Sequence, residues 1–213
     1  MYIPASFHEE RSEQLHALMR AHPLGTLITH GASGLLASPL PFLLDDANGE
    51  HGVLSAHMAR ANPHWKSLTG NTECLVIFAG TDGYVSPDWY PSKAATHKVV
   101  PTWNYAAVHV CGMLRVIDDL AWLTRQIADL TAVHEAIRPL PWQPSDAPED
   151  FIAAQMKAVI GLEIVITRID GKWKMSQNKE PADRDGVTRG MRDTADPHGN
   201  SAVADQIERC CRQ

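Results

Sequence analysis

Three short apolar runs near the start of the chain constrain its fold most strongly. They cover residues 24–30, 35–44 and 52–57, and turn-forming residues separate them. This spacing predicts consecutive antiparallel strands. Pro39 and Pro41 fall inside the second run, and a proline has no N–H to donate to a neighbouring strand. We therefore expect that strand to lie at a sheet edge, to be bulged, or to face a ligand.

Later apolar runs predict further strands. One covers residues 74–80, and another runs from Asn104 to Asp118 with a bend or bulge at Gly112. The runs GLEIVITRID and KWKMSQ predict a hairpin that turns around Gly171. A mostly antiparallel barrel with inserted helices is the simplest architecture for these strands.

Helices are predicted between and beside the strands. Ser6 and Glu9 match a capping box, which predicts that a helix begins there and ends near Pro23. The proline that follows Asn62 predicts a short helix as far as Gly70. Three more helices are expected at about residues 119–134, 149–159 and 201–212.

Composition and charge limit the class of protein. The 213 residues are 44% hydrophobic and 21% charged, which is enough for a substantial core. Nineteen basic and 25 acidic residues give a net charge of -6, so the charge does not support contact with DNA. No run approaches the roughly 20 apolar residues of a membrane span, and the start does not resemble a signal peptide. We expect a cytoplasmic protein without membrane contact.

Metal and disulfide sites are not predicted. The four cysteines form no CxxC pair, which fits a reducing compartment. The 11 histidines are scattered and show no spacing typical of metal ligands. No arrangement typical of a catalytic nucleophile is found either.

An aromatic stretch is the first candidate for a binding site. Residues 83–112 hold several large aromatic side chains among Pro, Ser, Lys and His, including Trp89, Tyr90, Trp103 and Tyr105. This mixture is too polar for a typical core. Flat apolar rings with a polar group suit a planar heteroaromatic ligand or a partner surface.

The segment SAHMARANPHWK, residues 55–66, is a second candidate. A strand is expected to end and a helix to begin within it, so free amides near Asn62, with Arg60 and Lys66, could hold a phosphate. The alternative is that Arg60 and Lys66 are ordinary solvated charges beside a capped helix. On this segment alone, the alternative is favoured.

Several motifs occur in order along the chain. They are MYIP with Phe7, HMARANPHW (57–65), VSPDWY (85–90), VPTWNY (100–105) with His109 and Gly112, and KMSQNK (174–179) followed by Asp185, Gly186 and Val187. Together they resemble the PaiB-like FMN-binding negative transcriptional regulators, and the resemblance covers most of the chain. It implies a mainly β protein of the α+β class, an antiparallel split β-barrel of the FMN-binding, pyridoxamine-phosphate-oxidase-like type with peripheral helices.

The resemblance also implies FMN as cofactor and two groups of binding residues. The first group would lie near the phosphate and ribityl chain: Ser38, Ser55, His57, Arg60, Asn62 and Lys66. The second would lie nearer the flavin ring: Trp103, Asn104, Gln177 and Asn178. Their chemistry suits these roles, because Arg and Lys neutralise phosphate, Ser and Asn bond hydroxyls, and Trp stacks on rings. No catalytic residue is assigned.

The domain organisation and assembly follow from the same resemblance. Split-barrel flavin sites lie between subunits, which implies a homodimer. Residues 1–178 would form the barrel domain with its inserted helices, and residues 179–213 a C-terminal extension packed on the barrel or on the dimer partner.

The implied function is that of an FMN-binding homodimeric regulator, a negative regulator of transcription. No helix-turn-helix signature or basic stripe is found in the sequence. Two alternatives stay open. One is a flavin-dependent oxidoreductase, either an FMN reductase or an enzyme like pyridoxamine-phosphate oxidase. The other is a dimeric scaffold that binds no flavin.

Overall fold

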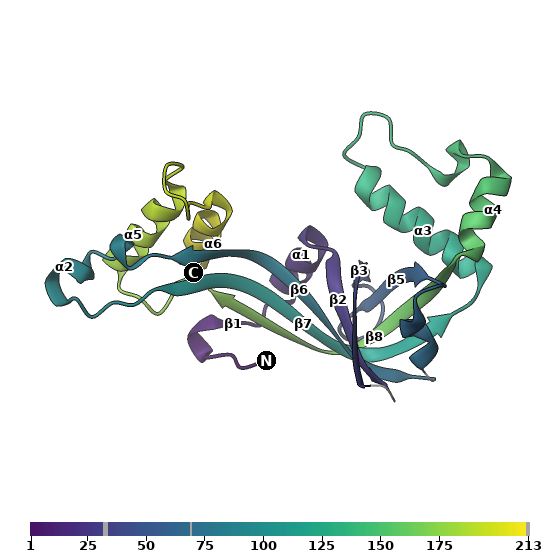
Figure 1. The fold of residues 1–213 in the computed structure, drawn as a ribbon, viewed down its shortest axis with the longest axis horizontal. Helices are drawn as coiled ribbons and strands as arrows, with labels where there is room; N and C mark the ends of the chain where they lie inside the picture. Colours follow the sequence, from purple (N-terminus) through teal and green to yellow (C-terminus); the bar gives the residue numbers. More distant parts are fainter. Residues whose placement is uncertain (32–33, 69, 212–213) are drawn as a thin grey trace. The chain divides into compact units, whose positions relative to one another are not determined.

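A mainly antiparallel sheet forms the framework of the protein (Figure 1). The computed structural model describes residues 1–31, 34–68 and 70–211. The eight-stranded sheet has the order β3-β2-β6-β7-β8-β5-β4, and β1 pairs with β8 outside this order. The strands are β1 His8–Glu9, β2 Leu24–Gly31, β3 Gly34–Pro41, β4 Leu43–Asp45, β5 Val53–Ala59, β6 Thr72–Val85, β7 Thr102–Ile117 and β8 Val159–Lys174. The sheet is not closed, because β3 and β4 are the two ends of the order among these strands.

Helices connect the strands and follow the last one. The α helices are α1 Ser12–Ala21, α2 Ser92–Thr96, α3 Leu120–Glu135, α4 Glu149–Lys157, α5 Pro181–Arg192 and α6 Ser201–Cys211. The 3-10 helices are η1 Ala5–Phe7, η2 Pro63–Ser67, η3 Pro87–Trp89 and η4 Pro144–Asp146.

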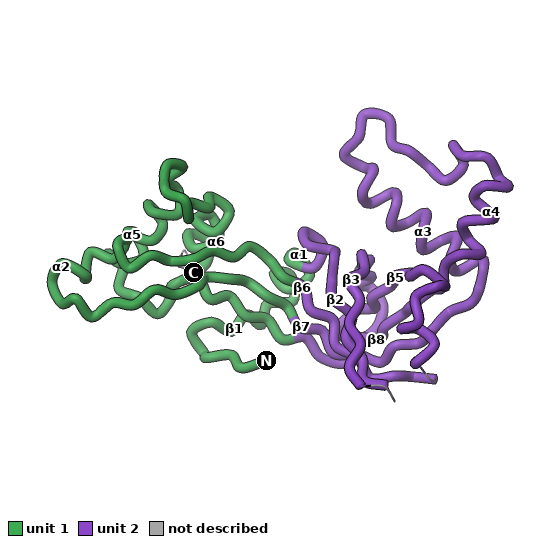
Figure 2. Tube along the Cα trace, in the orientation of Figure 1, with its two compact units in different colours: residues 1–18, 79–108, 170–213 green, residues 19–78, 109–169 purple. Residues whose placement is uncertain are grey.

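The chain divides into two compact units, which Figure 2 shows in different colours. Unit 1 contains residues 1–18, 79–108 and 170–213, and unit 2 contains residues 19–78 and 109–169. The strands β6, β7 and β8 contribute residues to both units. Unit 1 also holds β1, residues 83–108 of the aromatic stretch, α5 and α6, whereas unit 2 holds β2, β3, β4 and β5 with α3 and α4.

The strand predictions for unit 2 are largely confirmed. β2 and β3 form an antiparallel hairpin, and β3 is the end strand of the sheet order, which is one of the three outcomes expected from its two prolines. The second apolar run, however, forms two strands and not one. After β3 ends at Pro41, the N–H of Phe42 donates to Pro23 O at 2.8 Å and the ring of Phe42 is buried edge-on against Phe78. The following β4 then pairs with β5.

The prediction that the first helix begins at Ser6 is wrong, since α1 begins at Ser12. The carboxylate of Glu9 accepts a hydrogen bond from the backbone N–H of Arg11 at 3.0 Å and is paired with the Arg11 guanidinium. Glu9 also belongs to β1, which pairs with β8. These contacts use the carboxylate that a capping box at Ser6 would need.

The predicted hairpin around Gly171 is also wrong. β8 runs without a turn from Val159 to Lys174. A Cβ atom at Gly171 would lie 2.2 Å from the side chain of Leu15 and 2.7 Å from the carbonyl oxygen of Glu9. Glycine is required here by close packing within unit 1 and not by a turn.

The helices of unit 2 follow the prediction closely. Asp119 caps α3, because its side chain accepts a hydrogen bond from the backbone N–H of Trp122 at 2.7 Å. Asn62 likewise caps η2, although this segment is a short 3-10 helix that ends at Ser67 and not a longer helix that reaches Gly70. The helix predicted at 149–159 is observed as α4.

The C-terminal segment contains one helix that the sequence did not predict. α5 carries Gly186 and Gly190, where a Cβ atom would lie 2.0 Å from the Trp89 carbonyl oxygen and 2.2 Å from the Trp89 ring, respectively. The predicted last helix is observed as α6, and its expected final residue, Arg212, lies outside the described residues. α5 and α6 contact each other within unit 1 (Figure 1).

Candidate functional site

The residues predicted to bind FMN occur in both units. The six assigned to the phosphate and ribityl chain, which are Ser38, Ser55, His57, Arg60, Asn62 and Lys66, belong to unit 2. The four assigned to the flavin ring, which are Trp103, Asn104, Gln177 and Asn178, belong to unit 1. The contacts within each unit determine which of these side chains have atoms left for a ligand.

A buried histidine in unit 2 forms hydrogen bonds with two of the residues predicted to bind the phosphate and ribityl chain. His64 is only 2% exposed, and its Nδ1 lies 2.8 Å from Ser38 Oγ and its Nε2 2.8 Å from Thr29 Oγ1. Asn62 accepts from the backbone N–H of His64 at 3.0 Å and donates to Ser38 Oγ at 3.4 Å. Burial lowers the pKa of His64. Ser38 and Asn62 are therefore part of a buried hydrogen-bond network.

Arg60 already has an anionic partner. Its Nη1 and Nη2 donate to the two carboxylate oxygens of Asp118 at 2.8 and 2.6 Å, and its Nε and Nη2 also donate to the carbonyl oxygens of Lys157 and Val159. The hydrogen-bonded pair raises the pKa of Arg60 and lowers that of Asp118. A phosphate at Arg60 would have to compete with this carboxylate.

His57 and Ser55 lie on β5, on the face opposite the buried Leu54, Ala56 and Met58. His57 Nδ1 is 2.8 Å from Oε1 of Gln126 on α3, so α3 covers this face near His57. Gln126 is 4% exposed, and its Nε2 has no hydrogen-bond partner among the residues that the structure describes.

Lys66 is the exposed cation among the six residues predicted to bind the phosphate and ribityl chain. Its Nζ lies 5.8 Å from the centroid of the neighbouring Trp65 ring. Trp65 in turn donates its Nε1–H to the carbonyl oxygen of Arg60 at 2.9 Å. Lys66 forms none of the ion pairs found between described residues, so its charge can be directed to a ligand.

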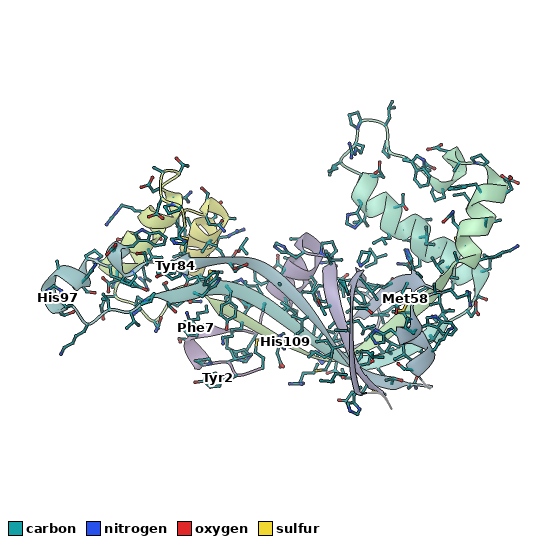
Figure 3. The ribbon with its side chains drawn as sticks, viewed as in Figure 1. Tyr2, Phe7, Met58, Tyr84, His97 and His109 are labelled. Carbon is teal, nitrogen blue, oxygen red and sulfur yellow. The ribbon has the colours of Figure 1, made fainter. Side chains whose placement is uncertain are left out.

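Trp103 offers an exposed ring in unit 1. It is 50% exposed, donates its Nε1–H to Asp82 at 2.7 Å, and contacts the Tyr84 ring edge-on at a centroid distance of 6.1 Å. Tyr84, labelled in Figure 3, also packs against His198 at 4.6 Å. These contacts fix the orientation of Trp103 and leave part of its ring for stacking.

The other three residues predicted to lie near the flavin ring differ in their environment. Asn104 is 1% exposed and donates to Ser176 Oγ at 3.0 Å. Gln177 bonds its own strand end, because its side chain accepts from the Met175 N–H and donates to the Trp173 carbonyl oxygen, both at 2.6 Å. Asn178 is exposed. The side chain of Gln177 thus stabilises the turn after β8.

The aromatic stretch is only partly a surface. Tyr90 is 2% exposed, which contradicts the interpretation that the stretch is too polar for a core, and its hydroxyl is buried without a hydrogen-bond partner in the described part of the chain. Lys179 Nζ lies 4.9 Å from the centroid of its ring. Trp89 packs on Gly190 of α5 and donates to Asp196 at 3.2 Å. Trp89 and Tyr90 therefore attach α5 to the stretch.

Comparison with protein families identifies the chain. The family described as "Putative FMN-binding domain" matches residues 1–168. The chain belongs to this FMN-binding domain family. An uncharacterized protein of Emericella nidulans is 39% identical over 90% of each chain. The protease synthase and sporulation protein PAI 2 of Bacillus subtilis is 26% identical over 93% of this chain and 92% of that protein.

Solved structures confirm the fold of this FMN-binding family member. The FAD and heme binding protein of Mycobacterium smegmatis aligns with a TM-score of 0.56 at 17% identity and covers 78% of this chain and 73% of that one. A conserved hypothetical protein of Mycobacterium tuberculosis aligns with a TM-score of 0.57 at 13% identity, covering 85% and 94%. The predicted class, an antiparallel split barrel with helices, is confirmed.

Family membership also confirms the predicted cofactor, FMN. The exposed ring of Trp103 and the exposed ammonium of Lys66 are chemically suited to a flavin ring and a phosphate. The assignment of the ten binding residues stays a prediction. Sequence reasoning did not include His64 and Gln126, although His64 lies inside the motif HMARANPHW.

Two further properties concern the described residues alone. No group of three or more His, Cys, Asp or Glu residues among them could hold a metal ion. None of their helices combines the length and the apolar character that crossing a membrane requires.

Proposed function

We propose that this protein is an FMN-binding homodimer that regulates gene expression. The observation that carries the proposal is the FMN-binding family match over residues 1–168, together with a Bacillus relative that aligns over nearly its whole length and is named for protease synthesis and sporulation. Both matches cover most of this chain, so the regulatory role is transferred to the whole chain and not to a fragment.

Exposed apolar residues support the homodimer. Four strand residues of unit 2 expose large apolar side chains: Leu24, Leu35, Met113 and Val165. Leu35 is 74% exposed and Leu24 is 65% exposed. Burial of such side chains against a second copy would remove apolar surface from water, which is the main driving force of association.

The net charge of -6 favours regulation without direct contact to DNA bases. FMN would act as the signal, because its binding can change the population of the regulatory form. Under this proposal the protein passes the flavin or redox state to another regulatory component. The oxidoreductase alternative instead requires that bound flavin is reduced by a nicotinamide and turned over.

Absorbance of the freshly purified protein, with light scattering, tests the proposal. We expect one FMN per protomer and the mass of a dimer. Trp103→Ala should weaken FMN binding about fivefold or more, because stacking on an aromatic ring contributes roughly 1–3 kcal/mol. Trp142→Ala is the control, since Trp142 is similarly exposed at 45% and lies between α3 and α4.

Three results would contradict parts of the proposal. A protein that neither contains FMN nor binds added FMN contradicts the cofactor role, and a monomeric mass contradicts the dimer. Rapid anaerobic bleaching of bound flavin by NADH or NADPH, followed by turnover, would favour the oxidoreductase. Retention of genomic DNA fragments above that of an unrelated acidic protein would add direct DNA binding.

A further inference from the structure

A small polar pocket lies at one end of unit 1. It has a volume of about 120 Å³ and is bordered by the start of β7, the end of β8 and the turn that follows. Six of its lining residues are polar: Thr102, Asn104, Lys174, Ser176, Asn178 and Lys179. All of them belong to unit 1, so the pocket is complete within one compact part of the chain.

Lys174 is held in the pocket with one donor left over. Its Nζ donates to Thr102 Oγ1 and to the carbonyl oxygen of Trp103, each at 2.5 Å. A lysine ammonium has three N–H donors and no acceptor. The two neutral oxygens fix the position of the ammonium group, and the third N–H can be directed to a ligand.

Among the described residues, no carboxylate forms an ion pair with the lysines at this pocket. Lys172, 8% exposed, lies 5.2 Å from the Tyr105 ring centroid and donates to the carbonyl oxygen of Tyr2. Lys179 lies over the Tyr90 ring. Within residues 1–31, 34–68 and 70–211, none of the ion pairs involves these lysines or Lys174.

The surroundings of the central lysine disfavour its charged form. Burial first, and then the positive charges of Lys172 and Lys179, lower the pKa of Lys174. Like charges brought together without a counter-charge are unfavourable, and an anion between them would remove the repulsion.

The remaining lining residues fix the shape of the pocket. Asn104 is buried and bonded to Ser176, and Ser176 adopts a left-handed backbone conformation with φ +64°. A non-glycine residue in this region marks a constrained turn. The turn places Asn178 and Lys179 after it on the pocket wall. These contacts hold the wall of the pocket in place at the turn after β8.

We propose that this pocket binds a phosphate group through Lys174 and Lys179. Its volume of about 120 Å³ is small, which suits a single phosphate group. Such a group can belong to FMN itself or to a second, phosphorylated ligand. The proposal does not depend on FMN binding, because the pocket residues supply the cations and donors by themselves.

Calorimetric titration with inorganic phosphate, at constant ionic strength and without flavin, tests the site. The wild type should bind phosphate saturably. Lys174→Met and Lys179→Met should each weaken binding about tenfold or more, because each removes one charge-assisted contact. Lys157→Met is the matched control: it makes the same charge change at an exposed position of α4 and should bind like the wild type. Circular dichroism establishes that each variant is folded.

Two further titrations, each with a flavin present, identify the source of the phosphate. The titration is repeated on protein saturated with FMN and with riboflavin, which lacks the phosphate. Loss of phosphate binding with FMN alone assigns the pocket to the cofactor, and retained binding in both arms assigns it to a second ligand. The proposal is overturned if the wild type shows no saturable phosphate binding, or if folded Lys174→Met and Lys179→Met bind phosphate as the wild type does.

Discussion

The two units treat their polar and basic groups in opposite ways. In unit 2, Arg60 is paired with Asp118, and both ring nitrogens of the buried His64 have hydroxyl partners. In unit 1, Lys174 is bonded to neutral oxygens and is close to two other ammonium groups. Arg60 and His64 of unit 2 are therefore satisfied by partners within the chain, whereas Lys174 of unit 1 leaves a positive charge to be compensated from outside.

This difference separates stability from binding. A network whose members satisfy one another stabilises a fold and holds its residues in place. A group of like charges costs stability and is retained where a ligand compensates it. Asn104 and Asn178, predicted to lie near the flavin ring, line the pocket with the uncompensated charge. The lysine pocket of unit 1 is therefore suited to anion binding, and the His64 network of unit 2 to structural support.

The largest expected effect is on the buried network of unit 2. His64→Leu removes the partner of Thr29 Oγ1 and leaves Ser38 Oγ with only the Asn62 amide at 3.4 Å. A buried polar group without a partner costs roughly 1–3 kcal/mol, so the variant should lose about 2–4 kcal/mol of unfolding free energy. Urea denaturation near neutral pH measures the loss.

Two controls determine whether the loss comes from this network. His30→Gln changes an exposed histidine of β2 and should alter the unfolding free energy by less than about 0.5 kcal/mol. The pKa of His64 is lowered from 6.5, so its stabilisation is complete above pH 6.5 and is lost as the pH falls through the lower pKa of the folded state. Wild-type stability should decrease more than that of His64→Leu in this window, and equal decreases would contradict a neutral, buried His64.

A smaller effect is expected when the carboxylate that compensates the charge of Arg60 in unit 2 is removed. Asp118→Asn leaves the Arg60 guanidinium without its carboxylate partner. Because Asp118 is 65% exposed, the urea midpoint should change little, but phosphate titration should show an additional, weaker binding event. In this variant Arg60 of unit 2, like Lys174 of unit 1, would carry a positive charge without a carboxylate partner.

Asp46→Asn is the matched control for that experiment. It removes the same charge and frees Arg20, another exposed arginine of unit 2. Arg60 lies beside the capped segment that begins at Asn62, whereas Arg20 lies in the last turn of α1. If both variants gained the same phosphate binding, the effect would reflect net charge alone, and the comparison of compensated and uncompensated sites would fail.

Local sequence signals predicted many of the strands and the helix caps. Pro39 and Pro41 limited β3 to three alternatives, of which the edge position is observed, because a missing N–H donor is a property of the residue itself. Asp119, one of the two caps expected for α3, was predictable because a capping side chain acts on residues three or fewer positions away. Such features need no knowledge of distant contacts.

Glycines that serve distant contacts were misinterpreted. Gly171 was expected to turn a hairpin, yet it permits close approach of Leu15 within a continuous strand. Gly186 and Gly190 lie in α5, which was not predicted, and they allow Trp89 to pack against this helix. In these cases the reason for glycine lies in a segment far away in the sequence.

The candidate site shows the same limit. The motifs predicted FMN and its candidate binding residues. They did not predict which side chains form hydrogen bonds with those residues in the folded chain. Asp118 follows Arg60 by 58 positions and Gln126 follows His57 by 69. Lys174 lies inside a recognised motif, yet its pocket exists only because β7 and β8 are neighbours in the sheet.

The smallest expected effect concerns the stability of the lysine pocket without ligand. Lys174→Met loses two hydrogen bonds to neutral oxygens and also relieves repulsion from Lys172 and Lys179. These contributions oppose each other, so the unfolding free energy near neutral pH should stay within about 1 kcal/mol of the wild type. Urea denaturation, with Lys157→Met as control, measures the difference.

The pH dependence gives this small effect a definite sign. Because the pKa of Lys174 is lowered from 10.5, the unfolded chain holds its proton at pH values where the folded chain has released it. The resulting stabilisation is complete above pH 10.5 and is lost as the pH falls through the folded pKa. Wild type should therefore gain stability relative to Lys174→Met as the pH rises through this window. A constant difference between the two proteins would mean that the positive charges in unit 1 are compensated within the chain, as they are in unit 2.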